Sequence, residues 1–268
     1  MNKIVLLIPY YNNSIGLIKS LNSIDASEEL DIIIVDDGSK NKFDEATLRK
    51  NFKAKGTLYF EYFKKNQGIE FALNHGLKIS LERGYKYTAR LDCGDVCLGK
   101  RFAIQAAFLD QNPEVKIVGS NVLAVDNNDN YLYSINLPLD DKEIKNKMYF
   151  NSMLIHPAIL FTTSIINAIG FYSTNHKSAE DFAFFFAISK KFKMANIEQY
   201  LTQIEINENG ISIQRRRNQV KARIQIIKEN FYIGYYPIYG LIRNYILLVI
   251  PYTIILAIKK RLKNERFN

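Results

Sequence analysis

Hydrophobic residues in the first 125 positions fall into two alternating kinds of segment. Short runs rich in Ile, Val and Leu predict buried strands, and these runs occupy residues 3–8, 31–35, 57–63, 87–91 and 116–119. Longer segments repeat their apolar positions about every 3.6 residues, which predicts helices, and these segments occupy residues 14–23, 68–81 and 101–110. Strands that alternate with helices indicate an α/β fold with a doubly wound, mostly parallel sheet.

The second half of the chain has a weaker pattern. Residues 131–137 predict an edge strand, and the polar segment 140–149 predicts a helix. Another strand is expected at 156–161, and another helix at 179–190. Four phenylalanines in this last helix are expected to form core rather than a ligand cage, and they are Phe182, Phe184, Phe185 and Phe186.

Charge is distributed unevenly along the 268 residues, of which 47% are hydrophobic. Residues 211–268 contain twelve Lys or Arg and two acids, a net charge of +10. The other 210 residues hold the remaining 24 basic and 25 acidic side chains, a net charge of −1, so the chain totals +9. The C-terminal segment is therefore a basic appendage on an otherwise neutral body.

The basic appendage is also strongly apolar. Its most continuous apolar stretch, residues 245–258, has 14 residues and contains Pro251, whereas a spanning helix needs about 20. We expect residues 221–268 to form one or two helices that lie on an anionic membrane surface. A helix pair packed in a homodimer is the alternative. Nucleic-acid binding is not expected, because no nucleic-acid-binding motif is visible.

Two features bear on the cellular compartment. Cys93 and Cys97 have no second pair that would complete a zinc site, which favours reduced thiols. The first eleven residues lack the long apolar region and cleavage site of a signal peptide. We therefore expect a cytoplasmic protein, held peripherally on the inner face of the cytoplasmic membrane by its basic segment.

Polar clusters follow three of the predicted strands, at residues 9–13, 35–39 and 90–95. Ligands of open α/β sheets bind outside the carboxyl ends of the strands. Each cluster taken alone is also a plausible turn or helix cap. Three acidic or aromatic clusters at successive strand ends favour a binding site instead.

Together these motifs resemble the nucleotide-sugar-binding domain of family 2 glycosyltransferases, which have the GT-A fold. The resembling segments are residues 8–12 (Ile-Pro-Tyr-Tyr-Asn), 35–39 (Val-Asp-Asp-Gly-Ser), 66–68 (Asn-Gln-Gly) with Ala72 and Asn74, 89–95 (Ala-Arg-Leu-Asp-Cys-Gly-Asp) and Glu180-Asp181. The resemblance implies a domain at 1–220, with a donor-binding half at 1–125 and an acceptor-binding half at 126–220. It also implies inverting transfer from a nucleotide diphosphate sugar, with UDP the expected nucleotide, to a bacterial cell-envelope glycan such as lipooligosaccharide, capsule or a lipid-linked saccharide.

The base of a nucleotide needs an apolar wall and a hydrogen-bond partner for its edge. Pro9 and Tyr11 can form the wall, and Asp37 can accept from a ring N–H. The resemblance assigns these positions to the base, although a core role for Tyr11 is the alternative. The expected nucleotide-sugar-binding residues are Pro9, Tyr11, Asn12, Asp36, Asp37, Asn66, Gly68, Arg90, Asp92 and Cys93.

A leaving nucleoside diphosphate can be stabilised by a divalent cation held by carboxylates, and oxygen ligands suit Mn²⁺ or Mg²⁺. The resembling motif of the family is Asp-x-Asp, and Asp92 fits its first position. Gly94 stands where the second acid is usual. We expect Asp92 and Asp95 to share this task, with Asp95 reaching the metal or a hydroxyl of the donor sugar. A helix-capping role is the alternative for both.

Inverting transfer needs a base that takes the proton of the acceptor hydroxyl. The resemblance assigns this role to Asp181, with Glu180 binding acceptor or orienting the base, and it places His156 beside the acceptor. A plain acidic helix start is the alternative for the pair. The basic segment at 214–217, together with Arg223, is expected to close over the donor phosphates or to be a solvated helix face.

Two other functions are compatible with an α/β sheet of this kind. A nucleotidyltransferase would usually carry a glycine-rich basic loop after the first strand, where this chain has Pro-Tyr-Tyr-Asn. A non-catalytic glycan-binding protein derived from a transferase is the second. The glycine at position 94 favours it, and the four aspartates at 37, 92, 95 and 181 oppose it.

Overall fold

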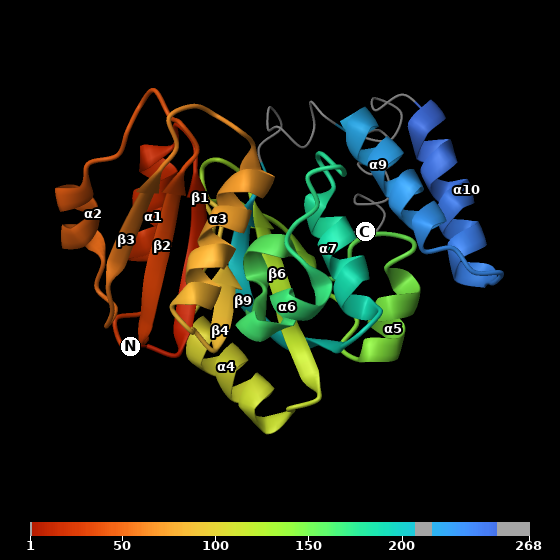
Figure 1. Cartoon of the computed structure of the whole chain (residues 1–268), viewed down its shortest axis with the longest axis horizontal. Helices are drawn as coiled ribbons and strands as arrows, with labels where there is room; N and C mark the ends of the chain where they lie inside the picture. Colours follow the sequence, from red (N-terminus) through yellow and green to blue (C-terminus); the bar gives the residue numbers. More distant parts are fainter. Residues whose placement is uncertain (1, 207–215, 251–268) are drawn as a thin grey trace.

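The computed structural model describes residues 2–206 and 216–250. In this part of the chain nine strands form one mixed sheet in the order β3-β2-β1-β4-β8-β6-β9-β5, and β7 pairs with β6 (Figure 1). The strands are β1 (Ile4–Tyr10), β2 (Leu30–Asp36), β3 (Leu58–Tyr62), β4 (Tyr87–Arg90), β5 (Val96–Cys97), β6 (Val115–Val125), β7 (Tyr131–Ile135), β8 (Leu160–Thr162) and β9 (Lys193–Glu205). β3, β2, β1 and β4 are parallel, as the sequence predicts.

Helices cover both faces of this sheet because the strands are apolar on both sides. Val5 and Leu7 of β1 belong to the core under α3 and α7, and the alternate residues of β1 belong to the core under α1 and α4. The described helices are α1 (Ser14–Asn22), α2 (Glu45–Asn51), α3 (Ile69–Glu82), α4 (Arg101–Gln111), α5 (Asp141–Lys147), α6 (Ile166–Ile169), α7 (Glu180–Ser189), α9 (Arg216–Glu229) and α10 (Tyr235–Val249). The phenylalanines of α7 are buried, which confirms their predicted core role.

Two long central strands depart from the sequence prediction. β6 continues to Val125, well beyond the predicted 116–119, and β9 is not predicted at all. The extension of β6 contains buried polar residues, which interrupt the hydrophobic pattern from which a strand is predicted. One of them, Asn121, donates to the Glu198 carbonyl (2.6 Å) and accepts from the Leu137 amide (2.9 Å) where the register shifts. β9 places several polar side chains in solvent, so its apolar pattern is weak.

The predicted strand at 156–161 is correct only at its end. Residues 156–158 form a 3-10 turn, η1 (His156–Ala158), and β8 begins at Leu160. Pro157 has no N–H to give to a ladder, which favours a turn at this point. His156 is therefore carried by a turn rather than by a strand, and a second 3-10 turn, η2 (Thr163–Ile165), follows β8.

The C-terminal helices α9 and α10 lie side by side at the end of the molecule opposite to α2 and β3 (Figure 1). α9 runs across residue 220, where the sequence suggests a boundary, and its buried Ile226 and Ile227 join the core that contains α7. Between residues 2 and 206 and between 216 and 250, no helix is long and apolar enough to cross a membrane. The last part of the apolar stretch, residues 251–258, and the basic end of the chain lie outside the described residues.

Candidate active site

The carboxyl ends of the parallel strands β1, β2 and β4 bring the predicted donor residues to one edge of the sheet. The two loops that follow β1 and β2 are joined by backbone-to-side-chain bonds. The Asn12 amide donates to Ser39 Oγ (2.9 Å), and Asn12 Oδ1 accepts from the Asn41 amide (2.9 Å). Tyr11 leaves 48% of its surface exposed beside these loops, so its ring is available to a base.

Asp37 is buried and is fully engaged in holding the loop before α3. Its carboxylate accepts from Asn66 Nδ2 (2.8 Å), the Gln67 amide (2.8 Å) and the Gly68 amide (2.9 Å). Gly68 has a positive φ of 119°, a conformation that favours glycine. A carboxylate offers about four acceptor positions, so one remains for the predicted contact with a base edge.

The neighbouring Asp36 is buried as well. Its Oδ1 accepts from the Ser39 amide (2.8 Å), and its Oδ2 has no hydrogen-bond partner within the described residues. The structure therefore places Asp36 and Asp37 mainly as supports of the donor loops, and direct donor contact stays a prediction for both.

Arg90 carries a charge in the interior, with only 1% of its surface exposed. Its Nη1 donates to the Leu91 carbonyl (2.8 Å) and pairs with Asp92 Oδ1 (2.5 Å). Its Nε and Nη2 are buried without a partner in the described chain. An unsatisfied buried donor costs about 1–3 kcal/mol, so this guanidinium has unused capacity for negative charge.

Glu180 and Asp181 begin α7 close to this guanidinium. Burial raises the pKa of Glu180 to about 7, and the neighbouring Asp181 charge adds to the rise. Burial also raises the pKa of Asp181, against which the Arg223 charge and a hydrogen bond from the Phe182 amide (2.7 Å) act. Glu180 is thus the member of the pair whose pKa lies near neutrality. For Asp181, the positive charges of Arg223 and Arg90 favour the ionised form.

His156 is buried and makes its hydrogen bond inside the protein. Its Nε2 lies 2.9 Å from the Tyr172 hydroxyl, and burial, with Arg90 nearby, lowers its pKa well below the usual range. Tyr172 is in turn fixed by Asn74, whose side chain bonds both the amide (2.8 Å) and the carbonyl (2.9 Å) of Tyr172. A neutral His156 therefore supports the loop before α7, and its contact with acceptor stays a prediction.

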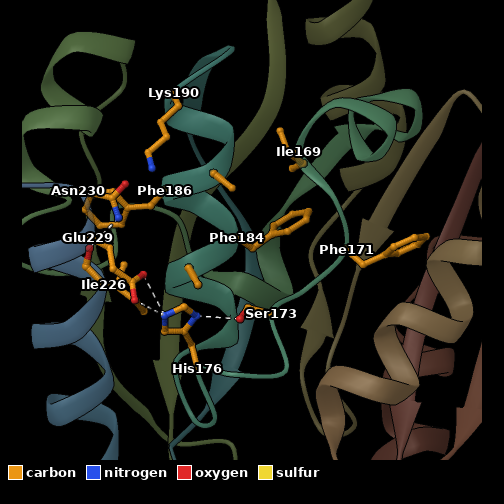
Figure 2. A pocket seen from close by; sticks show the side chains of 12 residues that line it. Ile169, Phe171, Ser173, His176, Phe184, Phe186, Lys190, Ile226, Glu229 and Asn230 are labelled. Carbon is orange, nitrogen blue, oxygen red and sulfur yellow. Dashed lines mark hydrogen bonds and ion pairs between the residues drawn. The ribbon is translucent and has the colours of Figure 1, made fainter.

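The same loop is fastened to α9 at a second point. His176 Nδ1 lies 2.8 Å from Ser173 Oγ, and His176 Nε2 lies 3.1 Å from the Glu229 carboxylate (Figure 2). These groups line a cavity of about 230 Å³ between the loop, α7 and α9. The loop before α7 is thus held by contacts with α3, η1 and α9 on the way to Glu180.

The two residues predicted to hold metal differ in exposure. Asp95 is buried, and its Oδ1 accepts from the Glu205 amide (2.9 Å) at the end of β9, so a metal shared between Asp95 and Asp92 stays a prediction. Residues 2–206 and 216–250 contain no group of three or more His, Cys, Asp or Glu that could hold a metal ion. Asp92 keeps 41% of its side chain exposed. A single carboxylate of this kind fits a cation whose other ligands are phosphates and water.

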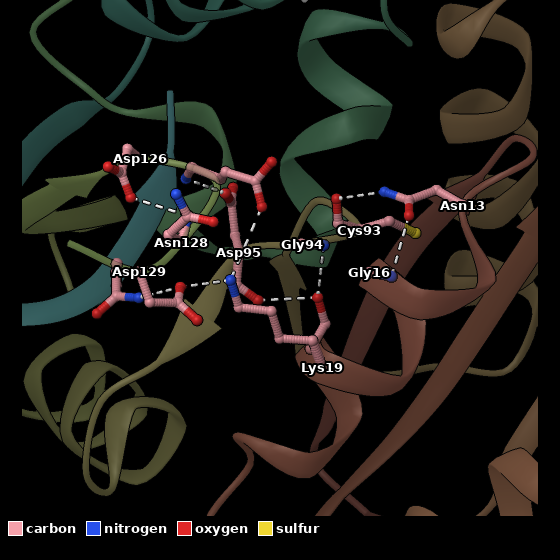
Figure 3. Close-up of polar contacts among 12 residues, drawn as sticks. Asn13, Gly16, Lys19, Cys93, Gly94, Asp95, Asp126, Asn128 and Asp129 are labelled. Atoms are coloured by element: carbon pink, nitrogen blue, oxygen red, sulfur yellow. Dashed lines mark hydrogen bonds and ion pairs between the residues drawn. The ribbon is translucent and has the colours of Figure 1, made fainter. Parts of the chain in front are cut away.

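Gly94 lies between Asp92 and Asp95 in a conformation that few other residues adopt. Its φ is +108°, and a Cβ there would lie 3.4 Å from Glu205 Oε2 (Figure 3 shows the surroundings). Lys19 pairs with Asp129 (2.5 Å) and lies 3.7 Å from Glu205 Oε2. A carboxylate from β9 thus stands near the place from which the missing acid would project, which the sequence pattern does not reveal.

Comparison with known proteins identifies the architecture that carries this site. A family model described as glycosyl transferase family 2 matches residues 5–170. The chain is a member of glycosyl transferase family 2. Its membership sets aside the nucleotidyltransferase alternative and supports a glycosyltransferase enzyme with the GT-A fold.

Relatives of this glycosyltransferase are distant in sequence. The bifunctional glycosyltransferase pgtA of Dictyostelium discoideum is 27% identical over 76% of the chain and 31% of its own length. The amylovoran biosynthesis glycosyltransferase AmsE of Erwinia amylovora is 26% identical over 62% of the chain and 60% of its own length. The chain therefore spans about a third of the first relative and three fifths of the second.

Two solved structures share the fold. TarS of S. aureus, residues 1–349, in complex with UDP-GlcNAc, has a TM-score of 0.65 and 17% identity, covering 90% of the chain and 69% of that structure. The mannosyltransferase PcManGT from Pyrobaculum calidifontis, in complex with GDP-Man and Mn²⁺, has a TM-score of 0.62 and 14% identity, covering 97% and 80%. Both neighbours bind nucleotide sugars.

The inward position of Asp95 predicts a pH-dependent effect of Asp95→Asn on stability. Burial raises the pKa of Asp95 to about 8 in the folded protein, whereas an unfolded Asp has a pKa of about 3.9. Between these values the folded state binds more protons, so wild-type stability falls as pH rises. The asparagine side chain of the variant does not titrate, so the stability of the variant relative to wild type should grow from about pH 4 to about pH 8.

Denaturant unfolding of both proteins across this pH range measures the difference. Parallel stability curves for Asp95→Asn and wild type would show that the pKa of Asp95 is not raised in the folded protein. Loss of Mn²⁺-dependent UDP affinity in a folded Asp95→Asn variant would show that Asp95 helps to hold the metal.

Proposed function

We propose that this enzyme transfers a sugar, with inversion, from a UDP-linked donor to a glycan acceptor of the bacterial cell envelope. One observation carries the proposal: a buried guanidinium, Arg90, pairs with the exposed carboxylate of Asp92 and acts on the charges of Glu180 and Asp181 at the start of α7. This arrangement supports a donor site and a base at one sheet edge. The fold shared with a UDP-GlcNAc complex supports the choice of donor, and the relative named for amylovoran biosynthesis supports a surface-glycan acceptor.

Each step of the proposed reaction has a residue for it. Tyr11 stacks on the base, with Pro9 completing the wall, and the loops held by Asp37 enclose the nucleotide. Asp181 accepts the proton of the acceptor hydroxyl, whose oxygen attacks the anomeric carbon from the face opposite to the nucleotide. The bond from that carbon to the diphosphate breaks, and UDP leaves. Glu180, protonated near neutrality, can donate a hydrogen bond to the acceptor or to Asp181.

Asp92 is the residue that would hold a divalent cation, Mn²⁺ or Mg²⁺. Such a cation would neutralise the negative charge that builds on the leaving diphosphate. Arg90 fixes the direction of the Asp92 carboxylate through their 2.5 Å ion pair. The remaining Asp92 oxygen is free to face the donor.

We also propose that α10 lies on the anionic cytoplasmic surface of the membrane. Its exposed apolar side chains recur at helical spacing along one face, which includes Tyr235, Ile238, Tyr239, Ile242, Tyr245, Ile246 and Val249. Ile233, just before the helix, is 93% exposed. An apolar face flanked by tyrosines and followed by a basic segment is typical of an interfacial helix. A homodimer through the same face is the competing arrangement.

UDP should bind in the presence of Mn²⁺ or Mg²⁺ and at least tenfold more weakly in chelator, because Asp92 and the diphosphate share the cation (about 1.4 kcal/mol per factor of ten). Calorimetric titration measures this. UMP is the matched control: it lacks the β-phosphate, so chelator should change its affinity far less. Equal UDP affinity with and without chelator would remove the cation from the proposal.

Asp181→Asn should lower kcat by about 100-fold or more, the usual contribution of general acid–base catalysis, and leave UDP affinity within about twofold of wild type, since a base acts in the chemical step. UDP release from the preferred sugar nucleotide measures kcat.

Glu180→Gln is the matched control for this substitution. It should reduce kcat less, and it should leave the acid limb of the kcat profile near its wild-type position, because Glu180, with a pKa of about 7, is already uncharged where Asp181 titrates. Near-normal turnover in Asp181→Asn with a large loss in Glu180→Gln would make Glu180 the base.

The double variant Ile233→Asp/Ile242→Asp should bind anionic vesicles about tenfold more weakly than wild type or worse, because burying one aliphatic side chain contributes about 1.5–3 kcal/mol. Co-sedimentation at low and high salt measures the binding. Ile15→Asp is the control: Ile15 is 83% exposed on α1, distant from α10. Unchanged vesicle binding, or a change from dimer to monomer instead, would overturn the membrane arrangement.

A further inference from the structure

Two arginines of the C-terminal helices meet beside the start of α7. Arg223 of α9 donates from Nη1 to Asn151 Oδ1 (2.9 Å), and its guanidinium lies 5.5 Å from the centre of the Phe182 ring. Arg243 of α10 donates from Nη1 to the Phe150 carbonyl (2.6 Å). Both guanidinium groups are therefore attached to neighbouring residues, 150 and 151, that follow α5.

The two charges lie close enough to repel each other. Burial is the main cause that lowers the pKa of each guanidinium, and the Arg243 charge lowers the pKa of Arg223 further. Asp181 is the carboxylate that counteracts this effect on Arg223. Among the residues that the structure describes, neither arginine forms a direct ion pair, and each uses one guanidinium nitrogen in a hydrogen bond.

Half-buried like charges that are only partly compensated are unfavourable, so a bound anion would stabilise both guanidinium groups. Guanidinium groups pair with phosphate through two parallel N–H donors, and each of these arginines has donors free for that geometry. The hydrogen bonds to Asn151 and to the Phe150 carbonyl hold the side chains in place, which reduces the entropy lost on binding.

We propose that Arg223 and Arg243 form a binding site for a phosphate group carried by the acceptor. This inference rests on the proposed transfer reaction, in which Asp181 takes the acceptor proton. α9, which carries Arg223, packs on one side of α7, whereas β1, β2 and β4, whose ends carry the donor loops, lie on the other side of α7 (Figure 1). A phosphate seated on the arginines would hold the acceptor hydroxyl near Asp181.

The position on α10 agrees with such an acceptor. Arg243 follows Ile242, which belongs to the exposed apolar face, and it precedes the buried Asn244. A phosphate at Arg243 would thus lie between the interior of the enzyme and the face proposed for the membrane. A lipid-linked phosphate and a phosphate within a soluble glycan share this chemistry, and both are accommodated.

The test is calorimetric titration of inorganic phosphate into the full chain saturated with UDP and Mn²⁺, at constant ionic strength. Wild type should bind phosphate. Arg223→Gln and Arg243→Gln should each weaken phosphate binding about tenfold or more, as expected for a lost charge-assisted hydrogen bond. Lys221→Gln is the control because it removes the same charge from an exposed site on α9, and its phosphate affinity should stay within about twofold.

UDP titrations of the same variants separate the acceptor from the donor. The proposal requires UDP affinity to stay within about twofold in every variant (less than about 0.4 kcal/mol). Reduced UDP affinity, with no phosphate binding to the UDP-saturated protein, would assign the arginines to the donor diphosphate. Equal phosphate affinity in wild type and both glutamine variants would leave no anion site.

Two further variants keep the test decisive if a glutamine variant does not fold. Arg223→Lys and Arg243→Lys retain the charge but lose the paired donors, so phosphate affinity should fall while circular dichroism and UDP affinity stay as in wild type. Phosphate affinity unchanged in both lysine variants would contradict the proposed paired geometry. Because these titrations need no turnover, failure of the transfer reaction itself would be seen separately.

Discussion

A buried guanidinium is the constraint on which the candidate active site depends. Arg90 ends β4, is almost completely enclosed, and is balanced directly by a single carboxylate, that of Asp92. A charge in the interior is tolerated only when other groups compensate for its lost hydration. The acidic start of α7 supplies further negative charge near it, and the neutral His156 avoids adding a second positive one. The electrostatic balance of this region therefore links strand β4, turn η1 and helix α7.

The same balance explains how two distant halves of the chain make one site. The donor loops come from the first 95 residues, and they are fixed by Asp37 and by the Asn12 to Ser39 contact. The proposed base comes from α7, whose preceding loop is fixed by Asn74, His156 and Glu229. α9 packs on α7 and brings Arg223 close to the proposed base, Asp181. The C-terminal helices thus belong to the electrostatics of the candidate active site as well as to the surface proposed for the membrane.

Much of this arrangement could be predicted from the sequence, because hydrophobic runs in parallel strands are continuous and their ends carry the polar motifs. This rule predicts the strands β1, β2 and β4. The periodic apolar pattern of helices likewise predicts α3 and the helix that begins at Glu180. Three features could not be predicted. β9 has polar residues at solvent-facing and bulged positions, Asp95 is turned inward by a bond to a strand 110 residues away, and Arg243 reaches Phe150 only through packing of α10. Each depends on tertiary contacts between segments whose local patterns are ordinary.

The central claim is that a carboxylate at the start of α7 activates the acceptor for a single displacement at the anomeric carbon. The anomeric configuration of the product, determined by proton NMR of the reaction with its preferred UDP-sugar, tests this most directly. Displacement by an acceptor activated at Asp181 predicts a product of opposite anomeric configuration to the donor. A product that retains the donor configuration would require two displacements or a front-face reaction, and would contradict the account.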